Sequence, residues 1–231
     1  MRPPVTKPFA WSWSAVEQAM SCMRLWYGTR GTKQFTAEPG PALLLGRKVH
    51  DEMAKAVLGT GGLSEERRWV QGFVDELRKM TPRPLVEHAV SLDRSFRSTG
   101  KWSPDVWLRA VFDVLWRDGK RALVVDWKTG RRKEPSDQNL LLAAILYRME
   151  SPPEQVTTCY VWLEASSTDL SRPSRAEAEA LLERLEQFPL RQMRELYGSG
   201  ATVDDVDPSP SWQCRFCPVV TCQHHPVRGG K

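Results

Sequence analysis

Long hydrophobic runs are missing from this chain of 231 residues. Its longest uninterrupted apolar segment covers residues 140–147, whereas a helix needs about 20 apolar residues to cross a bilayer. The first residues also lack the apolar stretch of a secretory signal. We therefore expect a soluble protein without a membrane partner, working in the cytoplasm of a bacterium or of a phage-infected host cell.

Cysteine is scarce and odd in number, with five residues. An odd count without secretory context argues against a disulfide framework. The segment Gly-x4-Gly-Lys-Ser/Thr of ATP-binding loops is absent too, so ATP-driven unwinding of a nucleic acid would require a helicase partner. The sequence therefore argues against a secreted domain held together by disulfides and against ATP-driven helicase activity in this chain.

The overall composition is that of one globular domain spanning residues 1–231. Hydrophobic residues make up 41% of the chain and charged residues 26%. Lysine and arginine number 33 against 28 acidic residues, which gives a net charge of +5. This positive balance permits a polyanionic partner without requiring one.

Hydrophobic periodicity predicts an α/β fold with a helical front end at 10–80, a core at 84–198 and a linker and cysteine tail at 199–231. Ser14 is a candidate cap for the first helix, Asp118-Gly119 predicts a hairpin turn, and Pro189 interrupts the last long helix. The expected helices cover 11–27, 41–58, 64–81, 136–149 and a long segment opened by a capping box at 174–177; the expected strands cover 85–96, 106–116, 122–127 and 156–163.

The strongest chemical signal is a pair of acids with a lysine. Asp126 and Lys128 share one face of a strand, while Trp127 points to the other face. A hairpin at 118–119 would bring Asp113 to the neighbouring strand, although the register cannot be read from the sequence. Two carboxylates and an amine suit Mg²⁺ or Mn²⁺ acting on a phosphate, and the plainer alternative is a surface ion pair at a strand end.

A second signal is the thiol spacing C-x2-C-x4-C near the end of the chain. Together with a thiol near the start it could form a four-thiolate site, for zinc or for a [4Fe–4S] cluster, which spacing alone does not distinguish. A local zinc site that takes its fourth ligand from His224 or His225 is the alternative. The four thiols are Cys22, Cys214, Cys217 and Cys222, whereas Cys159 is expected to pack inside a strand.

A basic run follows the lysine motif. Arg131, Arg132 and Lys133 would attract phosphates beside the expected metal site. The chain also contains ten tryptophans. Most of them, such as Trp69 and Trp107, are expected in the core, and one or two are expected to stack on bases of a single strand. These features indicate DNA as the partner.

Taken in order, these motifs resemble the PD-(D/E)XK nuclease superfamily, in particular its RecB-like branch with an iron–sulfur cluster. That branch includes AddB-type and CRISPR-associated RecB-like exonucleases. The resemblance runs from about Ser14 to Cys222. It rests on Cys22, the segment LGRKVH at 45–50, Glu87, RAVFD at 109–113, DWKTG at 126–130, Gln138 and the three terminal cysteines.

The resemblance implies a role for each matching residue. Asp113, Asp126, the Trp127 carbonyl and His50 would bind the metal. Lys128 would position the attacking water, Glu87 would support the water or a second metal, and Gln138 would orient the lysine or a DNA phosphate. Cys22, Cys214, Cys217 and Cys222 would hold the [4Fe–4S] cluster.

The chain departs from the family pattern at two positions. Ala110 replaces a glycine before the first metal aspartate, and Leu142 replaces a tyrosine four residues after the glutamine. Tyr147 cannot stand in for that tyrosine, because nine residues of helix rotate it by about 180°. DNA contact or strand choice through that tyrosine is therefore not expected here.

The fold implied by the resemblance is restriction-endonuclease-like, a central mixed β-sheet flanked by helices with the cysteine cluster packed on it. The implied function is a metal-dependent DNA exonuclease acting on single strands or DNA ends, in recombination, repair or phage DNA processing, with a helicase or recombination partner. The alternatives are a structure-specific endonuclease, a non-catalytic DNA-binding or assembly subunit that keeps the fold, and a zinc-binding scaffold.

Overall fold

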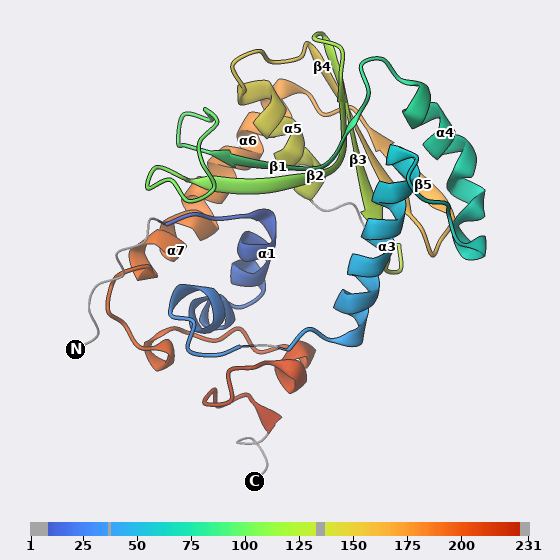
Figure 1. Ribbon diagram of the computed structural model, residues 1–231. Helices are drawn as coiled ribbons and strands as arrows, with labels where there is room; N and C mark the ends of the chain where they lie inside the picture. The colour runs from blue at the N-terminus through green and yellow to red at the C-terminus, as the bar shows by residue number, and fades with distance from the viewer. Residues whose placement is uncertain (1–8, 37, 133–136, 227–231) are drawn as a thin grey trace.

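The computed structural model describes residues 9–36, 38–132 and 137–226 and has a five-stranded mixed sheet at its centre (Figure 1). The strands follow one another in the order β1-β2-β3-β4-β5. Strands β1, β2 and β3 are antiparallel, β4 runs parallel to β3, and β5 returns antiparallel to β4. Their bounds are β1 Leu85–Leu92, β2 Leu108–Arg117, β3 Arg121–Lys128, β4 Gln155–Trp162 and β5 Ser167–Ser171. The expected mixed sheet is confirmed.

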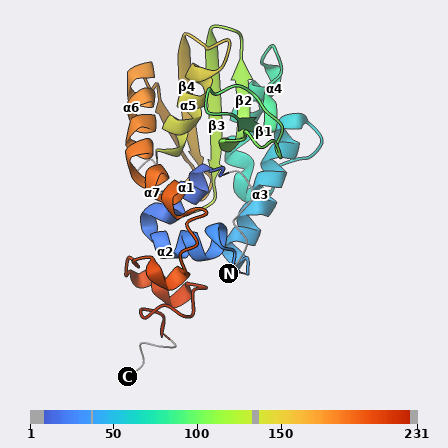
Figure 2. The same cartoon turned by 90° about the vertical axis from the view of Figure 1, so that its left-hand side faces the viewer.

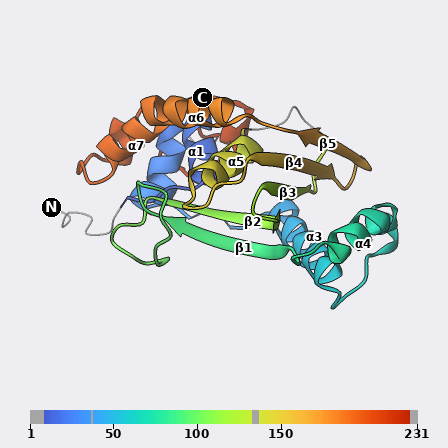
Figure 3. The same ribbon diagram turned by 90° about the horizontal axis from the view of Figure 1, so that it is seen from above.

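Helices cover both faces of the sheet. Figure 3 shows α1, α5, α6 and α7 on one side, with α3 and α4 on the other side near one end. The apolar core is correspondingly divided into two clusters. The helices are α1 Trp13–Ser21, α2 Met23–Trp26, α3 Pro41–Leu58, α4 Gln71–Lys79, α5 Gln138–Arg148, α6 Arg175–Leu185 and α7 Arg191–Leu196. No helix within the described ranges is long and apolar enough to cross a membrane.

The β2–β3 turn forms where the sequence predicts it. The Asp118 carboxylate accepts the backbone N–H groups of Lys120 and Arg121 at 3.1 and 2.8 Å, and Gly119 has a φ of 95°, which favours glycine. Parallel strands cannot be joined by such a turn, so the chain passes from β3 to β4 through α5. The capping box is confirmed as well, because Ser174 and Glu177 bond reciprocally at the start of α6.

The expected single helix over 11–27 is wrong. Cys22 is extended, with φ −164° and ψ 112°, and separates α1 from α2. The Cys22 N–H and the Ser21 hydroxyl both donate to the Gln18 carbonyl and so close the end of α1. The residue before this helix is Ser12 rather than Ser14. The break lies at the cysteine predicted to bind a cluster.

The segment expected as a linker between core and cysteine tail is packed against the rest of the molecule. Its residues Val203 and Val206 are buried in the larger apolar cluster. Arg24, itself buried, donates through Nε to the Val206 carbonyl at 2.5 Å and through Nη2 to the Asp204 carbonyl at 3.0 Å. The Tyr27 hydroxyl donates to the Ala201 carbonyl at 2.9 Å. The C-terminal segment is therefore docked on the N-terminal helices, as Figure 2 shows.

Other differences are smaller. The segment expected as a helix over 64–81 opens with a 3₁₀ turn, Glu65–Val70, before α4. Trp69, expected in the core, is 39% exposed, whereas Trp107 is buried as expected. Strand β1 ends at Leu92 rather than at residue 96, and the start expected for α5 at 136 lies outside the described residues.

Glu52 fixes the connection between α3 and the turn that follows it. Its carboxylate accepts the Ser64 N–H at 2.7 Å and both Nε and Nη2 of Arg67 at 3.0 and 2.9 Å. We expect Glu52→Gln to lower the free energy of unfolding by about 2 kcal/mol, because hydrogen bonds to charged groups contribute about 1.5–3 kcal/mol. The control is a thermal melt of Glu66→Gln, because Glu66 is 78% exposed and its carboxylate comes no closer to Arg67 than 3.9 Å. Equal melting temperatures for the two variants would contradict this role.

Candidate metal centre

The candidate site lies where strands β2 and β3 separate. Their pairing ends at Val114 and Val125, and Asp113 and Asp126 are the next residues beyond that pair. The Asp113 carboxylate accepts the backbone N–H of Trp127 at 2.9 Å, in place of a strand-to-strand bond. The side chain of Trp127 is buried in the smaller apolar cluster. Asp113 is therefore held rigidly between the two strands.

Asp126, Lys128 and Gln138 form a closed triangle of contacts. The Lys128 ammonium lies 2.5 Å from Asp126 Oδ2 and donates to Gln138 Oε1 at 2.9 Å. Gln138 Nε2 donates to Asp126 Oδ1 at 3.3 Å. Gln138 is the first residue of α5, so the start of that helix fixes the orientation of the lysine. The expected shared face of Asp126 and Lys128 is confirmed.

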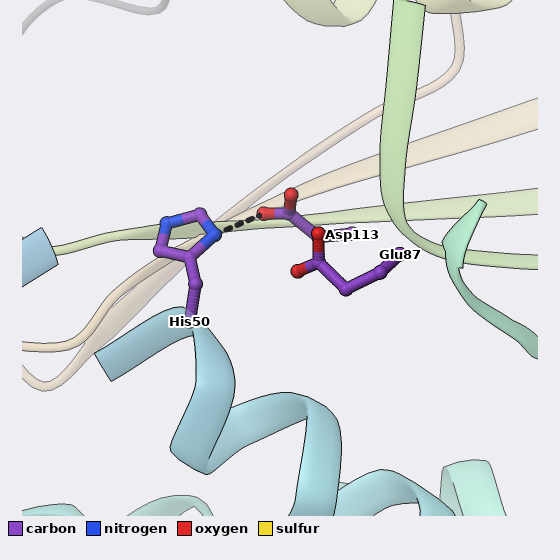
Figure 4. Close-up of side chains that lie close together, drawn as sticks. All are labelled: His50, Glu87 and Asp113. Carbon is purple, nitrogen blue, oxygen red and sulfur yellow. Dashed lines mark ion pairs between the residues drawn. The ribbon is translucent and has the colours of Figure 1, made fainter. Parts of the chain in front are cut away.

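His50 and Glu87 approach Asp113 from two other elements (Figure 4). His50 of α3 places Nδ1 3.4 Å from Asp113 Oδ2. Among the described residues, the donor atoms of His50, Glu87 and Asp113 form the group of potential metal ligands that all lie within 4.8 Å of one another. Asp126 lies outside that group and is held by Lys128 and Gln138 instead. The Trp127 carbonyl stays a predicted ligand.

Glu87 has an unusual backbone conformation. Its φ is 48°, in the left-handed region that residues with a side chain rarely adopt. The flanking pairs Val86–Val114 and His88–Phe112 put Glu87 opposite Asp113 on the neighbouring strand. Such outliers persist where the surrounding structure determines them, commonly at functional sites. Glu87 has this backbone conformation at the point where its carboxylate lies beside that of Asp113.

The positive charges within this site do not balance the negative charges of its carboxylates. Burial raises the pKa of Asp126 to about 6; Lys128 opposes this rise and Asp113 adds to it. Burial and then the charge of Asp113 raise the pKa of Glu87, while the hydrogen bond with Asp113 raises the pKa of His50. Carboxylates that hold protons this readily are stabilised by a cation, and carboxylate oxygen donors suit Mg²⁺ or Mn²⁺. The donor set therefore fits a divalent ion.

An open cavity of about 660 Å³ is lined by Asp113, Asp126 and Lys128. Glu87 lines a second hollow, which His50 also lines. Arg131 lines the first cavity and is exposed. Arg132 instead forms an ion pair with Asp169, with Nη2 2.5 Å from Oδ1, so its charge is partly neutralised. Lys133 lies outside the described residues. Of the predicted basic run, Arg131 is the described cation that reaches the cavity.

Tyr160 is a cavity residue that the sequence did not single out. It pairs with Asp126 across β3 and β4, and its ring lies 5.0 Å from the Lys128 ammonium. Its hydroxyl accepts the Asn139 N–H at 3.0 Å, which ties the start of α5 to β4. Leu142 also lines the cavity, while Tyr147 is turned away and donates to the Pro173 carbonyl. Pairing the buried 156–163 strand with 122–127 would have revealed Tyr160.

The four predicted cluster cysteines line one small pocket, together with His225. Backbone N–H groups of Ser209 and Ser211 donate to the sulfurs of Cys22 and Cys214, each at 3.4 Å. In the described part of the chain, no three of these thiols, with or without a histidine, lie within 4.8 Å of one another. Four-coordinate zinc with bonds of about 2.3 Å would bring the sulfurs to roughly 4 Å. Cys159 is buried in β4, away from this pocket, as expected.

Two solved structures are similar to this chain. The crystal structure of SSO0001 is 14% identical over 97% of this chain and 89% of its own, with a TM-score of 0.45. A protein of Eubacterium rectale, described as "Putative exonuclease", is 10% identical over 90% of this chain and 86% of its own, with a TM-score of 0.54. At this level of identity, the similarity to the Eubacterium rectale structure concerns the fold alone. No curated protein matched the sequence significantly.

The sequence itself carries the family relationship. Residues 10–222 match the family described as the PD-(D/E)XK nuclease superfamily. The matched range contains the sheet, the separated strands with their acids, and all four pocket cysteines. The chain belongs to the PD-(D/E)XK nuclease superfamily.

Proposed function

We propose that this chain is a Mg²⁺- or Mn²⁺-dependent deoxyribonuclease that removes nucleotides from single-stranded DNA or DNA ends. The observation that carries the proposal is the convergence of His50, Glu87 and Asp113 within 4.8 Å. These residues come from three different elements (Figure 4). His50 and Asp113 line the open cavity that also contains Lys128. The carboxylates of Glu87 and Asp113 supply the oxygen donors that a hard divalent ion prefers.

Each residue has a separate task in hydrolysis of a phosphodiester. A bound divalent ion would supply a nucleophilic water and stabilise the charge that develops on phosphate. Asp113 contributes a rigid carboxylate because Trp127 N–H holds it. Lys128, fixed by Asp126 and Gln138, orients the attacking water and neutralises negative charge. Arg131 attracts the DNA backbone to the cavity.

The experiment is a hydrolysis assay on end-labelled single-stranded and duplex DNA. Acid-soluble nucleotides are expected to appear with Mg²⁺ or Mn²⁺ and not with EDTA. Circular single-stranded DNA separates the modes of attack, because an exonuclease leaves it intact and an endonuclease cuts it. DNA binding without cleavage under any divalent metal would favour the non-catalytic assembly subunit.

We propose further that Cys22, Cys214, Cys217 and Cys222 hold a [4Fe–4S] cluster, which would place the chain in the RecB-like branch. The four thiols line one pocket, which supports a shared four-thiolate site, and the resemblance to the RecB-like branch favours iron–sulfur over zinc. The presence of Cys22 in the same pocket disfavours a local zinc site with His224 or His225. A role in recombination, repair or phage DNA processing, a helicase partner and a cytoplasmic location belong to the same proposal.

A further inference from the structure

Trp102 is the most exposed large hydrophobic residue among those the structure describes, at 82% exposure. It lies in the loop between β1 and β2. Large aromatic rings are generally buried, and an exposed one commonly marks a contact surface. Two cations flank its ring, the Lys101 ammonium at 5.3 Å and the Arg109 guanidinium at 5.7 Å from the ring centroid.

Arg109 connects this ring to the metal centre. It is fixed by two donations to the Lys101 carbonyl, through Nη2 at 2.9 Å and Nε at 3.3 Å. It also lines the same open cavity as Asp113. Arg109 and Val111 share one face of β2, and both line the cavity that contains Asp113. The exposed ring and the metal centre therefore lie at two ends of one surface.

That surface has small side chains between its ends. Ala89 pairs with Val111 and Ser91 with Arg109 across the two strands. Val111 is 47% exposed, and of the described helices α3 and α4 cover this side only at the far end of the sheet (Figure 3). Asp113 lies four positions after Arg109 along the strand, which corresponds to about 13 Å. Stacked nucleotides rise by about 3.4 Å, so roughly four of them span this distance.

We propose that Trp102, with Lys101 and Arg109, is a platform that binds single-stranded DNA and directs it along β1 and β2 to the metal centre. The ring would stack on an unpaired base while the two cations contact flanking phosphates, a combination suited to single strands of any sequence. A paired base keeps its faces inside the duplex, so duplex DNA gains little from this ring. This inference rests on the proposed function, because it assigns the strand class that enters the same site.

A binding experiment in EDTA tests the platform without hydrolysis. Fluorescence anisotropy of a short labelled oligothymidylate should show roughly tenfold weaker binding by Trp102→Ala than by the unaltered protein. Trp102→Phe should restore most of the affinity, because it keeps an aromatic face. Trp212→Ala is the matched control, since Trp212 is 67% exposed but lies on the cysteine tail, and it should bind as the unaltered protein does. Unchanged melting temperatures exclude misfolding.

The outcomes separate this inference from the proposed function. Weaker binding by Trp102→Ala supports the platform even when no metal produces hydrolysis, in which case only the nuclease assignment fails. Binding by Trp102→Ala within twofold of the unaltered protein overturns the platform, even when DNA is hydrolysed. An equal loss for blunt duplex and single strand, or an equal loss in Trp212→Ala, also overturns it.

Discussion

Asp113→Asn should reduce the rate of DNA hydrolysis by at least about 1,000-fold. Metal catalysis supplies several kcal/mol of transition-state stabilisation, and each 1.36 kcal/mol corresponds to about tenfold in rate. The substitution removes the charge at the centre of the His50, Glu87 and Asp113 group. It keeps the shape of the side chain and an oxygen that can accept the Trp127 N–H. The measurement is the initial rate of nucleotide release at saturating Mg²⁺.

Asp118→Asn is the matched control for this prediction. Asp118 is another hydrogen-bonded carboxylate of the same hairpin, but it belongs to the β2–β3 turn rather than to the cavity. Its variant should hydrolyse DNA at close to the normal rate. Binding of oligothymidylate by Asp113→Asn, measured in EDTA, should be retained because the fold persists. Hydrolysis by Asp113→Asn at more than a tenth of the normal rate would remove Asp113 from the catalytic machinery.

Cys214→Ser should lose the colour and the iron of the anaerobically purified protein and lower its melting temperature by about 8–16 °C. Binding of a metal or cluster contributes directly to folding free energy. In a chain of this length a loss of about 4 kcal/mol corresponds to that shift. The effect is large because the cysteine pocket joins the break between α1 and α2 to the C-terminal segment. Visible absorption, metal content and a thermal melt measure the three changes.

Cys159→Ala gives the control for the cysteine prediction. Cys159 is buried in β4 and does not line the cysteine pocket, so its variant should keep both colour and iron. If the unaltered protein contains zinc and no iron, the iron–sulfur proposal is wrong and the zinc-binding scaffold takes its place. Full iron content in Cys214→Ser would show that this thiol is not a ligand.

Local chemistry explains why much of the fold was predictable. The Asp118-Gly119 turn, the Ser174 capping box and the apolar strands each depend on residues close in sequence. Alternation along one strand was enough to put Asp126 and Lys128 on the same face. Strand β5 escaped prediction because its sequence, STDLS, alternates weakly and lies at the edge of the sheet. The motif order then limited which elements could meet at the site.

Contacts between distant segments account for what the sequence did not reveal. The register of β2 on β3 had to be known before Asp113 could be seen to replace a strand bond at Trp127 N–H. The position of Tyr160 beneath Lys128 depends on the parallel pairing of β4 with β3. Residues 198–210 are small or acidic, which is typical of a linker. The structure instead shows Arg24 and Tyr27 donating hydrogen bonds to backbone carbonyls of this segment. Each feature joins segments whose sequences carry no sign of one another.

The docking of the C-terminal segment by Arg24 has a consequence for synthesis of the protein. A ribosome releases the N-terminal helices long before it makes the carbonyls of Asp204 and Val206 that Arg24 requires. Until then the apolar positions that Val203, Val206 and Val219 cover remain open to water. Synthesis of residues 203–219 is thus the step that closes this part of the molecule, and a product that stops before them leaves a guanidinium without these acceptors beside an uncovered apolar surface.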